Sequence, residues 1–338
     1  MKKFFTVMLV VLMVAGTVFA NGAAEGSQGA AEPKQSMILR YAETNSSKDE
    51  RALATQHFAD LVKERTGGRI EIQVYPGAQL GGSKDVIQSL QLGAIDMCNE
   101  PASNLTGWGC KVPYLDVISL PFIFQSVDQA VNVMNGPVGQ KICDDINNSG
   151  FGIIALDHFV AGARNIFTNK PITKLSDISG LKIRVQQSAI YIDTFKAFGA
   201  SPTPLDNSEV YSAIQTGVID GAENPVKGYL NNKFYEVAKY YSWSNYLIQP
   251  STMFISQVTW NRLSKEDQEI FKQAAQETTA WFQELTASKL EGQIQQLKDA
   301  GVTFTDLEDY DAWVAAVQPI YDKYSAYNDI IQQIKSTK

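Results

Sequence analysis

The sequence predicts an α/β fold, either one large domain or two lobes, over the residues that follow a short N-terminal segment. Two observations predict it. Short apolar segments typical of strands recur between segments with helical spacing. An apolar content of 44% in a chain of 338 residues is also enough to build real hydrophobic cores. The regular alternation of strands and helices favours largely parallel sheets.

The first half of the chain carries clear signals of this alternation. A helix is expected at residues 49–65, where Ala54, Phe58 and Val62 share one face. Residues 70–75 alternate isoleucine and valine with polar residues and stop at Pro76, which is typical of a strand. The elements expected here, in order, are strand 37–41, helix 49–65, strand 70–75, helix 83–92, strand 95–99, helices 126–135 and 138–147, and strand 152–156.

The second half repeats the alternation and then departs from it. Its expected elements are strands near Asn165 and Lys182, helices 190–198 and 208–216, and strands 239–243 and 253–256. Residues 265–298 then contain no proline and one glycine, Gly292. A helix of that length spans roughly 50 Å, so it should run across both lobes. The alternative is two ordinary helices broken near Gly292.

The N-terminus indicates export. Lys2 and Lys3 precede an apolar segment at 4–15, and the chain then reads Val-Phe-Ala-Asn at 18–21, with a small-residue cleavage site after Ala20. This is the pattern of a signal peptide over residues 1–20, cleaved after Ala20, with a retained anchor as the alternative. Residues 21–36 are rich in alanine, glycine and glutamate and predict a disordered spacer. No second apolar segment is long enough to span a membrane, so we expect a soluble, exported mature chain.

Charge and cysteine content narrow the classes of partner. The formal net charge is −7, and an acidic surface argues against nucleic acid and against anionic membranes as partners. An anionic ligand would have to be captured by local cations. The three cysteines are Cys98, Cys110 and Cys143, an odd number without a CxxC motif. We read them mainly as small buried residues, although a Cys98–Cys110 disulfide stays open.

Two arginines lie within short apolar runs. Arg184 lies in a run that reads as a buried strand, and Arg164 lies twenty residues earlier in a similar run. A buried charge is costly unless it is paired. An arginine fork that faces a cleft fits a bound carboxylate in a bidentate way. The alternative for each arginine is an internal salt bridge with a partner distant in sequence.

Catalysis has little support. The two histidines are His57, beside an apolar helix face, and His158, for which a cleft position is plausible. The HExxH, GxSxG and GxxxxGK[ST] motifs are absent from the sequence, and ligands for a metal are not clustered. We therefore expect no cofactor and no metal. Two hypotheses remain: a binding protein for an organic anion, which we favour, or an exported enzyme that acts on one.

Short motifs lie along nearly the whole mature chain. They are 72–81 (IQVYPGAQLG), 92–96 (LGAID), 120–124 (LPFIF), 170–172 (KPI), 180–185 (GLKIRV), 199–204 (GASPTP), 208–211 (SEVY), 215–221 (QTGVIDG) and 223–225 (ENP). These motifs resemble those of one family, the DctP-type extracytoplasmic solute-binding proteins of tripartite ATP-independent periplasmic (TRAP) transporters. The combination, in family order, is far more specific than any single motif.

The resemblance implies a periplasmic-binding-protein-like fold of two α/β lobes that close on a ligand, with a long helix that spans both. Lobe I would comprise 37–160 and 250–289, and lobe II 161–249 and 290–338. The resemblance also implies that Arg184 salt-bridges a ligand carboxylate and that Arg164 and Asn224 support it. The implied ligand-binding residues are Arg184, Arg164, Asn224, Gln186, Glu100, Asn104, Asn45, Asn207 and Tyr246. The implied partners are a small organic acid and the membrane permease subunits, and the implied location is the periplasm.

The expected ligand rests on similarity to one subgroup of this family. The run 182–188, together with residues 136–139 (GPVG) and 162–164 (GAR), is similar to a subgroup that binds hexuronates such as glucuronate or galacturonate. Two departures keep other ligands open. Pro225 stands where that subgroup often has a second asparagine, and Asn207 stands where it tends to have an aromatic residue. A C4-dicarboxylate, a keto acid or sialic acid therefore remains an alternative.

Overall fold

The computed structural model describes residues 36–338. The predicted signal peptide and nearly all of the predicted spacer lie outside the described residues. The strands are β1 (Met37–Ala42), β2 (Ile70–Tyr75), β3 (Met97–Glu100), β4 (Ile153–Thr168), β5 (Lys182–Val185), β6 (Ser201–Pro204), β7 (Gly221–Asn224), β8 (Tyr240–Ser256) and β9 (Thr303–Asp306).

Helices separate and follow these strands. They are α1 (Glu50–Arg65), α2 (Ser83–Gln91), α3 (Asn104–Gly107), α4 (Val127–Met134), α5 (Pro137–Asn148), α6 (Ala189–Ala197), α7 (Val210–Gln215), α8 (Val226–Asn231), α9 (Gln257–Trp260), α10 (Lys265–Asp299), α11 (Tyr310–Ala316), α12 (Gln318–Lys323) and α13 (Asn328–Ser336). Short 3-10 turns add η1 (Leu115–Ser119), η2 (Leu175–Ile178), η3 (Asn207–Glu209), η4 (Phe234–Glu236) and η5 (Ser325–Tyr327). The last three helices have no counterpart among the expected elements.

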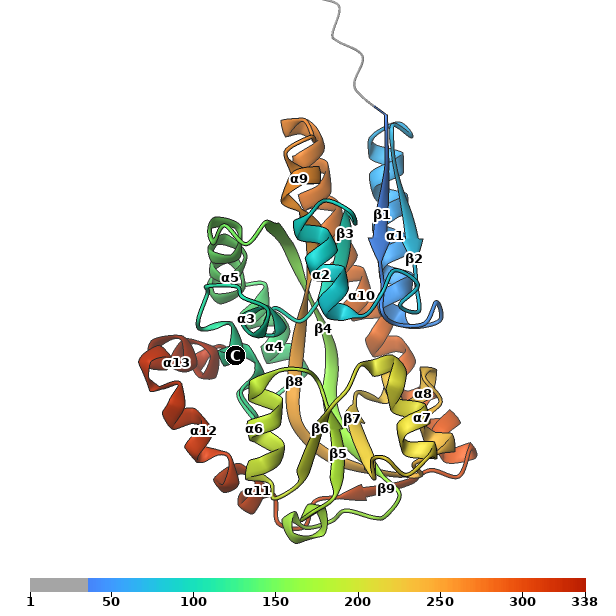
Figure 1. Ribbon diagram of the computed structural model, residues 1–338, viewed down its shortest axis with the longest axis vertical. Helices are drawn as coiled ribbons and strands as arrows, with labels where there is room; N and C mark the ends of the chain where they lie inside the picture. The colour runs from blue at the N-terminus through green and yellow to red at the C-terminus, as the bar shows by residue number, and fades with distance from the viewer. Residues whose placement is uncertain (1–35) are drawn as a thin grey trace, which may run out of the picture. The chain divides into compact units, whose positions relative to one another are not determined.

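The strands form one mixed sheet in the order β2-β1-β3-β8-β4-β7-β5-β6, with β9 beside β8. The expectation of largely parallel sheets is wrong in one respect. The two longest strands, β4 and β8, pair antiparallel with each other, and β3 and β7 also join them antiparallel. In Figure 1 these long strands run through the middle, with β1, β2 and β3 toward one end and β5, β6 and β7 toward the other.

The sequence pattern divided each long strand into two shorter ones, and the reason is local. The pairing of β4 with β8 shifts register between Val160 and Ala163, where Gly162 adopts a φ of 98°. Pro250, which lacks an N–H and is unusual within a sheet, pairs with Val160 beside this shift. A bulge of this kind interrupts the apolar alternation without ending the strand.

The long helix α10 is continuous, as predicted, and it joins two hydrophobic cores. Its N-terminus is capped by Ser264, which accepts a hydrogen bond from the backbone N–H of Asp267. Phe271 and Phe282 pack with α1 and the β1 side of the sheet, whereas Leu297 packs in a separate core with β7 and α8. A glycine costs only about 1 kcal/mol in a helix, so packing at both ends holds the helix through Gly292.

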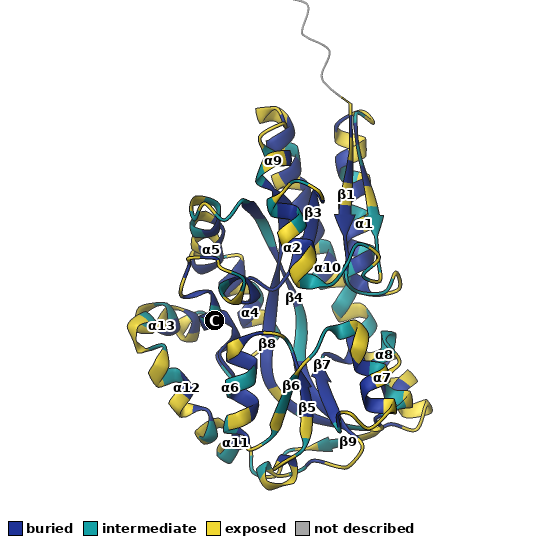
Figure 2. Cartoon of the chain, viewed as in Figure 1, coloured by how far each residue is buried: buried dark blue, intermediate teal, exposed yellow. Residues whose placement is uncertain are grey.

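The largest group of buried side chains packs α4, α5, α6 and the C-terminal helices against the sheet. Buried members include Ile142, Phe195 and Trp313. Figure 2 shows β4 and β8 buried along most of their length, while the outer faces of α12 and α13 are exposed. Of the helices described here, none is both long and apolar enough to cross a membrane.

Candidate functional site

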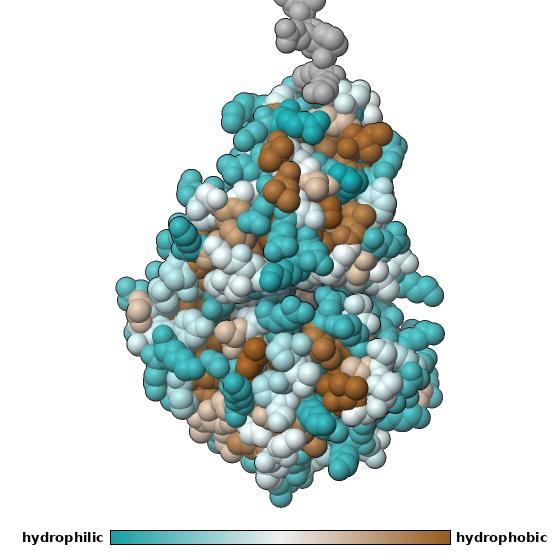
Figure 3. Space-filling model, in the orientation of Figure 1, coloured by the Kyte–Doolittle hydropathy of each residue, from teal (hydrophilic) through white to brown (hydrophobic). Residues whose placement is uncertain are grey.

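A polar cleft of about 420 Å³ lies between residues that follow β1 and β3 on one side and residues of and after β5 and β7 on the other. Hydrophilic side chains gather around a hollow at this level of the molecule in Figure 3. Eight of the nine ligand-binding residues expected from the sequence line the cleft: Asn45, Glu100, Asn104, Arg164, Arg184, Gln186, Asn207 and Asn224. Their contact with a ligand remains a prediction.

Arg184 is held in place by the strand that carries it. Its neighbours on β5, Ile183 and Val185, are fully buried in the core, so Arg184 projects from the opposite face. Its Nε donates a hydrogen bond to the carbonyl oxygen of Leu205 at 2.9 Å. The side chain is only 5% exposed, and burial lowers its pKa, which Glu223 partly opposes. A guanidinium oriented by its backbone partner in this way is prepared for an anionic ligand.

Arg164, in contrast, already has a partner. Its Nη2 donates to Oε1 of Glu223 at 2.9 Å and to the Glu223 carbonyl oxygen at 3.0 Å, and its Nε pairs with Oε2 of the same carboxylate. Burial lowers the pKa of Arg164, but the carboxylate of Glu223 outweighs it and the pKa is raised overall. The internal salt bridge that the sequence left as an alternative is therefore present for Arg164.

Glu223 is the residue that sequence reasoning missed. It is fully buried on β7, and its Oε1 also lies 4.0 Å from Nη1 of Arg184. Tyr246 donates its hydroxyl to Oε2 of Glu223 at 2.8 Å. Among the described residues, Tyr246 does not line the cleft, so it supports the ion pair from behind. Glu223 lies in the segment 221–225 (GAENP), which is not an apolar run, so it lacked the signal that singled out the two arginines.

The opposite side of the cleft carries polar atoms that lack partners. Glu100 on β3 and Asn104 on α3 are buried, and Glu100 Oε1 and Asn104 Oδ1 have no hydrogen-bond partner in the described structure. Burial raises the pKa of Glu100 to about 7. Gln186 donates to Oε1 of Gln249 at 2.8 Å. A buried polar atom without a hydrogen-bond partner, such as Glu100 Oε1 or Asn104 Oδ1, lowers the stability of the fold unless a ligand or water binds to it.

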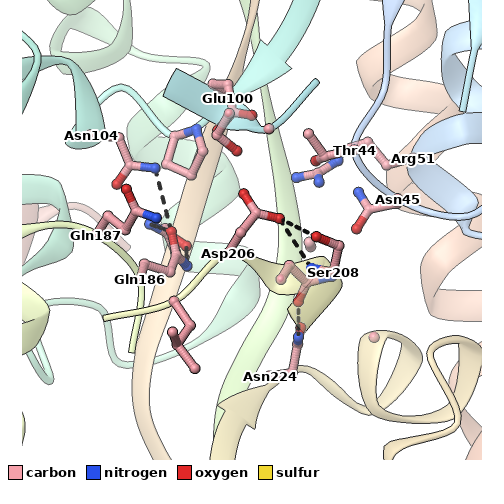
Figure 4. Close-up of a pocket in the computed structure, with 18 of the residues that line it drawn as sticks. Thr44, Asn45, Arg51, Glu100, Asn104, Gln186, Gln187, Asp206, Ser208 and Asn224 are labelled. Atoms are coloured by element: carbon pink, nitrogen blue, oxygen red, sulfur yellow. Dashed lines mark hydrogen bonds between the residues drawn. The ribbon is translucent and has the colours of Figure 1, made fainter. Parts of the chain in front are cut away.

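A third set of residues closes the side of the cleft near α1. Asn45 donates its side-chain amide to Oε1 of Glu43 at 2.8 Å. Asp49, the N-cap of α1, pairs with Lys227 of α8 at 3.2 Å, and both side chains are buried. Neither Asp49 nor Lys227 was expected from the sequence. Figure 4 shows Asn45, Thr44 and Arg51 on one side of the cleft and Asn104, Gln186 and Gln187 on the other.

The histidines and cysteines lie away from this cleft. The cleft position considered for His158 is wrong, because its ring is buried between Gly139, Thr252 and the thiol of Cys143, 3.2 Å from Nε2. Burial lowers the pKa of His158. The three cysteines are free and buried, so Cys98 and Cys110 are not bridged. Over residues 36–338, no group of three or more histidine, cysteine or acidic side chains is placed to hold a metal ion.

Comparison with known proteins finds similar proteins over most of the chain. The profile of the DctP family, the bacterial extracellular solute-binding proteins of family 7, matches residues 41–327. A solute-binding protein from Chromohalobacter salexigens is 36% identical over 272 residues, covering 80% of each chain. The sialic acid-binding periplasmic protein SiaP of Vibrio cholerae is 31% identical over 79% of this chain and 82% of its own.

Solved structures are similar over the same region. A TRAP periplasmic solute-binding protein from Pseudomonas putida F1 with bound D-glucuronate is 33% identical, with a TM-score of 0.86 over 89% of this chain and 98% of its own. One from Xanthobacter autotrophicus Py2 with bound β-D-galacturonate is also 33% identical, with a TM-score of 0.84 over 89% of this chain and all of its own.

Proposed function

Because this chain belongs to the DctP family of TRAP transporter solute-binding proteins, we propose that it is the periplasmic receptor for a hexuronate such as glucuronate or galacturonate. It captures the sugar acid in the cleft and delivers it to the membrane permease subunits. The observation that carries the proposal is the buried, preoriented guanidinium of Arg184 in a cleft whose lining also includes amide and carboxyl groups. The bound hexuronates of the two solved relatives support the choice of ligand.

The balance of charge favours a ligand with one carboxylate. The carboxylate of Glu223 forms a bidentate ion pair with Arg164. The positive charge of Arg184, 4.0 Å from Glu223, is therefore left to pair with the ligand. The other two largely buried cations that line the cleft, Arg51 and Lys227, face Glu43 and Asp49. A second carboxylate on the ligand would therefore have no buried cation of its own, because the remaining cation, Lys84, is exposed to solvent.

The buried acceptor atoms that lack hydrogen-bond partners favour a ligand rich in hydroxyl groups. Glu100 Oε1 and Asn104 Oδ1 are buried acceptors that need donors. The hydroxyls of a sugar ring supply donors, whereas succinate or pyruvate supplies none in its ionised form. A site built around such groups discriminates strongly against an analogue that lacks them, because its own buried atoms are then left unpaired.

Titration calorimetry with a panel of acids tests the choice of ligand. We expect glucuronate or galacturonate to bind at least roughly tenfold tighter than succinate, pyruvate or sialic acid, which is about 1.4 kcal/mol. Tight binding of succinate or pyruvate, with neither uronate bound, would overturn the hexuronate assignment. The family assignment does not depend on this result.

We further propose that the cleft closes on its ligand between lobe I (37–160 and 250–289) and lobe II (161–249 and 290–338). The lobe boundaries after residues 160 and 249 support this, because Val160 and Pro250 pair with each other beside the register shift in the long strands. The Asp49–Lys227 pair would then join the lobes in the closed state. We also propose that the signal peptide is cleaved after Ala20.

Small-angle X-ray scattering tests closure. Saturating ligand should lower the radius of gyration, because contacts available only in the closed state shift the population toward it. The same concentration of an acid that does not bind serves as the control. An unchanged radius of gyration, with binding measured independently, would contradict the closure.

A further inference from the structure

The charged groups of the cleft are distributed unevenly along it. Arg184 lies on β5 and Glu100 lies on β3, and three strands, β8, β4 and β7, separate these two in the sheet. Neighbouring strands lie roughly 4.8 Å apart, so the two side chains approach the cleft from distant positions. A ligand anchored through a carboxylate at Arg184 therefore extends its other end toward Glu100.

At the end of the cleft near Glu100, the two largely buried cations each face a carboxylate, and Lys84, which also lines the cleft, is exposed to solvent. Arg51 Nε lies 3.6 Å from Oε1 of Glu43, and Lys227 Nζ lies 3.2 Å from Oδ1 of Asp49. Glu100 itself is 3% exposed, and its Oε1 has no hydrogen-bond partner. Its negative charge therefore acts on whatever part of the ligand reaches this end.

Asp206 adds a second carboxylate on the way to Glu100. It precedes η3 and accepts hydrogen bonds from the backbone N–H and hydroxyl of Ser208 at 3.1 and 2.9 Å. A Cβ added at Gly82 would lie 3.0 Å from its Oδ2, so the carboxylate of Asp206 reaches the opposite wall of the cleft. Figure 4 shows Glu100 and Asp206 entering the same space from opposite sides.

We propose that Glu100, reinforced by Asp206, excludes ligands with a second carboxylate at the end remote from Arg184, so that the receptor accepts sugar monoacids and rejects the corresponding diacids. This inference rests on the proposed function, because it assumes a sugar acid in the cleft. A hydroxyl group at that end donates to Glu100, whereas a carboxylate meets a like charge in a site from which water is largely excluded.

The exclusion should depend on pH in a defined direction. The groups that face Glu100 are Arg51 of α1, Glu43 after β1, Ser83 of α2 and Asp206 before η3. Burial is the largest influence and raises the pKa of Glu100 to about 7. Glu100 is then mostly ionised at pH 8 and mostly neutral at pH 6, while a sugar diacid keeps both charges. Discrimination against the diacid should therefore weaken as the pH falls from 8 to 6.

D-Gluconate and D-glucarate form the probe pair, because both are open chains that differ only in whether C6 is an alcohol or a carboxylate. A carboxylate that takes the place of a hydroxyl beside Glu100 meets a like charge, so we expect a loss of affinity of at least about tenfold. Calorimetry at pH 8, in buffer with a chelator, should show glucarate weaker than gluconate by at least that factor. D-Glucuronate, measured in parallel, tests the proposed function independently.

Glu100→Gln removes the charge and keeps the shape of the side chain. It should improve glucarate binding at least tenfold relative to gluconate and abolish the pH dependence of their ratio. Glu71→Gln, which removes a charge from a solvent-accessible pair with Lys63, is the control and should leave the ratio unchanged. If glucuronate binds the wild type but Glu100→Gln leaves glucarate as weak as before, shape excludes the diacid and the proposal is overturned.

The wild-type protein gives a second test that needs no variant. A glucarate-to-gluconate affinity ratio that is constant between pH 6 and pH 8 would also overturn the proposal. Equal binding of the two acids by the wild type at pH 8 would do the same. If no sugar acid binds, the proposed function fails first, and this outcome is distinct from failure of the charge filter alone.

Discussion

Replacing Arg184 with lysine will weaken binding of the sugar acid by roughly 2 kcal/mol or more, which is the scale of a charge-assisted hydrogen bond. Arginine presents a planar fork to a carboxylate, whereas lysine offers a single ammonium group that loses its proton more readily when buried. In the folded protein the Nε of Arg184 is already bound to Leu205, so the fork is fixed before a ligand arrives.

Titration calorimetry on Arg184→Lys measures this loss, and thermal unfolding checks that the variant is folded. Arg262→Lys is the matched control, because Arg262 is exposed and lies outside the cleft. If Arg184→Lys binds the sugar acid with wild-type affinity, Arg184 does not contact the ligand carboxylate.

Replacing Glu223 with glutamine will destabilise the protein by roughly 3–5 kcal/mol, because it leaves the buried charge of Arg164 without its partner. Arg184 also loses the nearest carboxylate, 4.0 Å away. A loss of this size corresponds to a fall in melting temperature on the order of 10 °C for a chain of this length. The Tyr246 hydroxyl can still donate to the amide oxygen, so the loss reports mainly on charge.

A double-mutant cycle separates the ion pair from other effects. Arg164→Gln combined with Glu223→Gln removes both charges and should recover a large share of the stability lost in Glu223→Gln alone. Glu71→Gln, whose side chain is about half exposed, should change the melting temperature little. A Glu223→Gln variant as stable as the wild type would show that this ion pair is not a main source of stability.

The two arginines show how far sequence reasoning reaches toward the site. Both were recognisable as buried charges, because each stands in an apolar strand run. Their different roles were not recognisable. Glu223 lies 59 residues from Arg164 in the sequence, and its pairing follows from β7 lying beside β4 in the sheet. Local pattern identifies a buried charge, but the neighbour that compensates it depends on strand order.

Other parts of the site lie beyond sequence reasoning for the same reason. Asp49 and Lys227 are 178 residues apart and meet only because α1 and α8 face each other near the cleft. The raised pKa of Glu100 likewise depends on burial by surrounding elements, with Arg51 and Glu43 nearby. Such contacts carry no signal in any short window of sequence.

The sequence by itself determined the elements that local physics controls. Helical spacing, strand alternation and the lack of proline at residues 265–298 were enough for most helices and strands, including the continuous α10. The tertiary structure alone decided that β4 and β8 are single long strands paired antiparallel, with Pro250 beside a register shift. It also decided that Arg164 forms the two-contact ion pair with Glu223, whereas Arg184 is held by the carbonyl oxygen of Leu205. Strand order and burial are collective properties of the packed chain, because each depends on residues far apart in sequence.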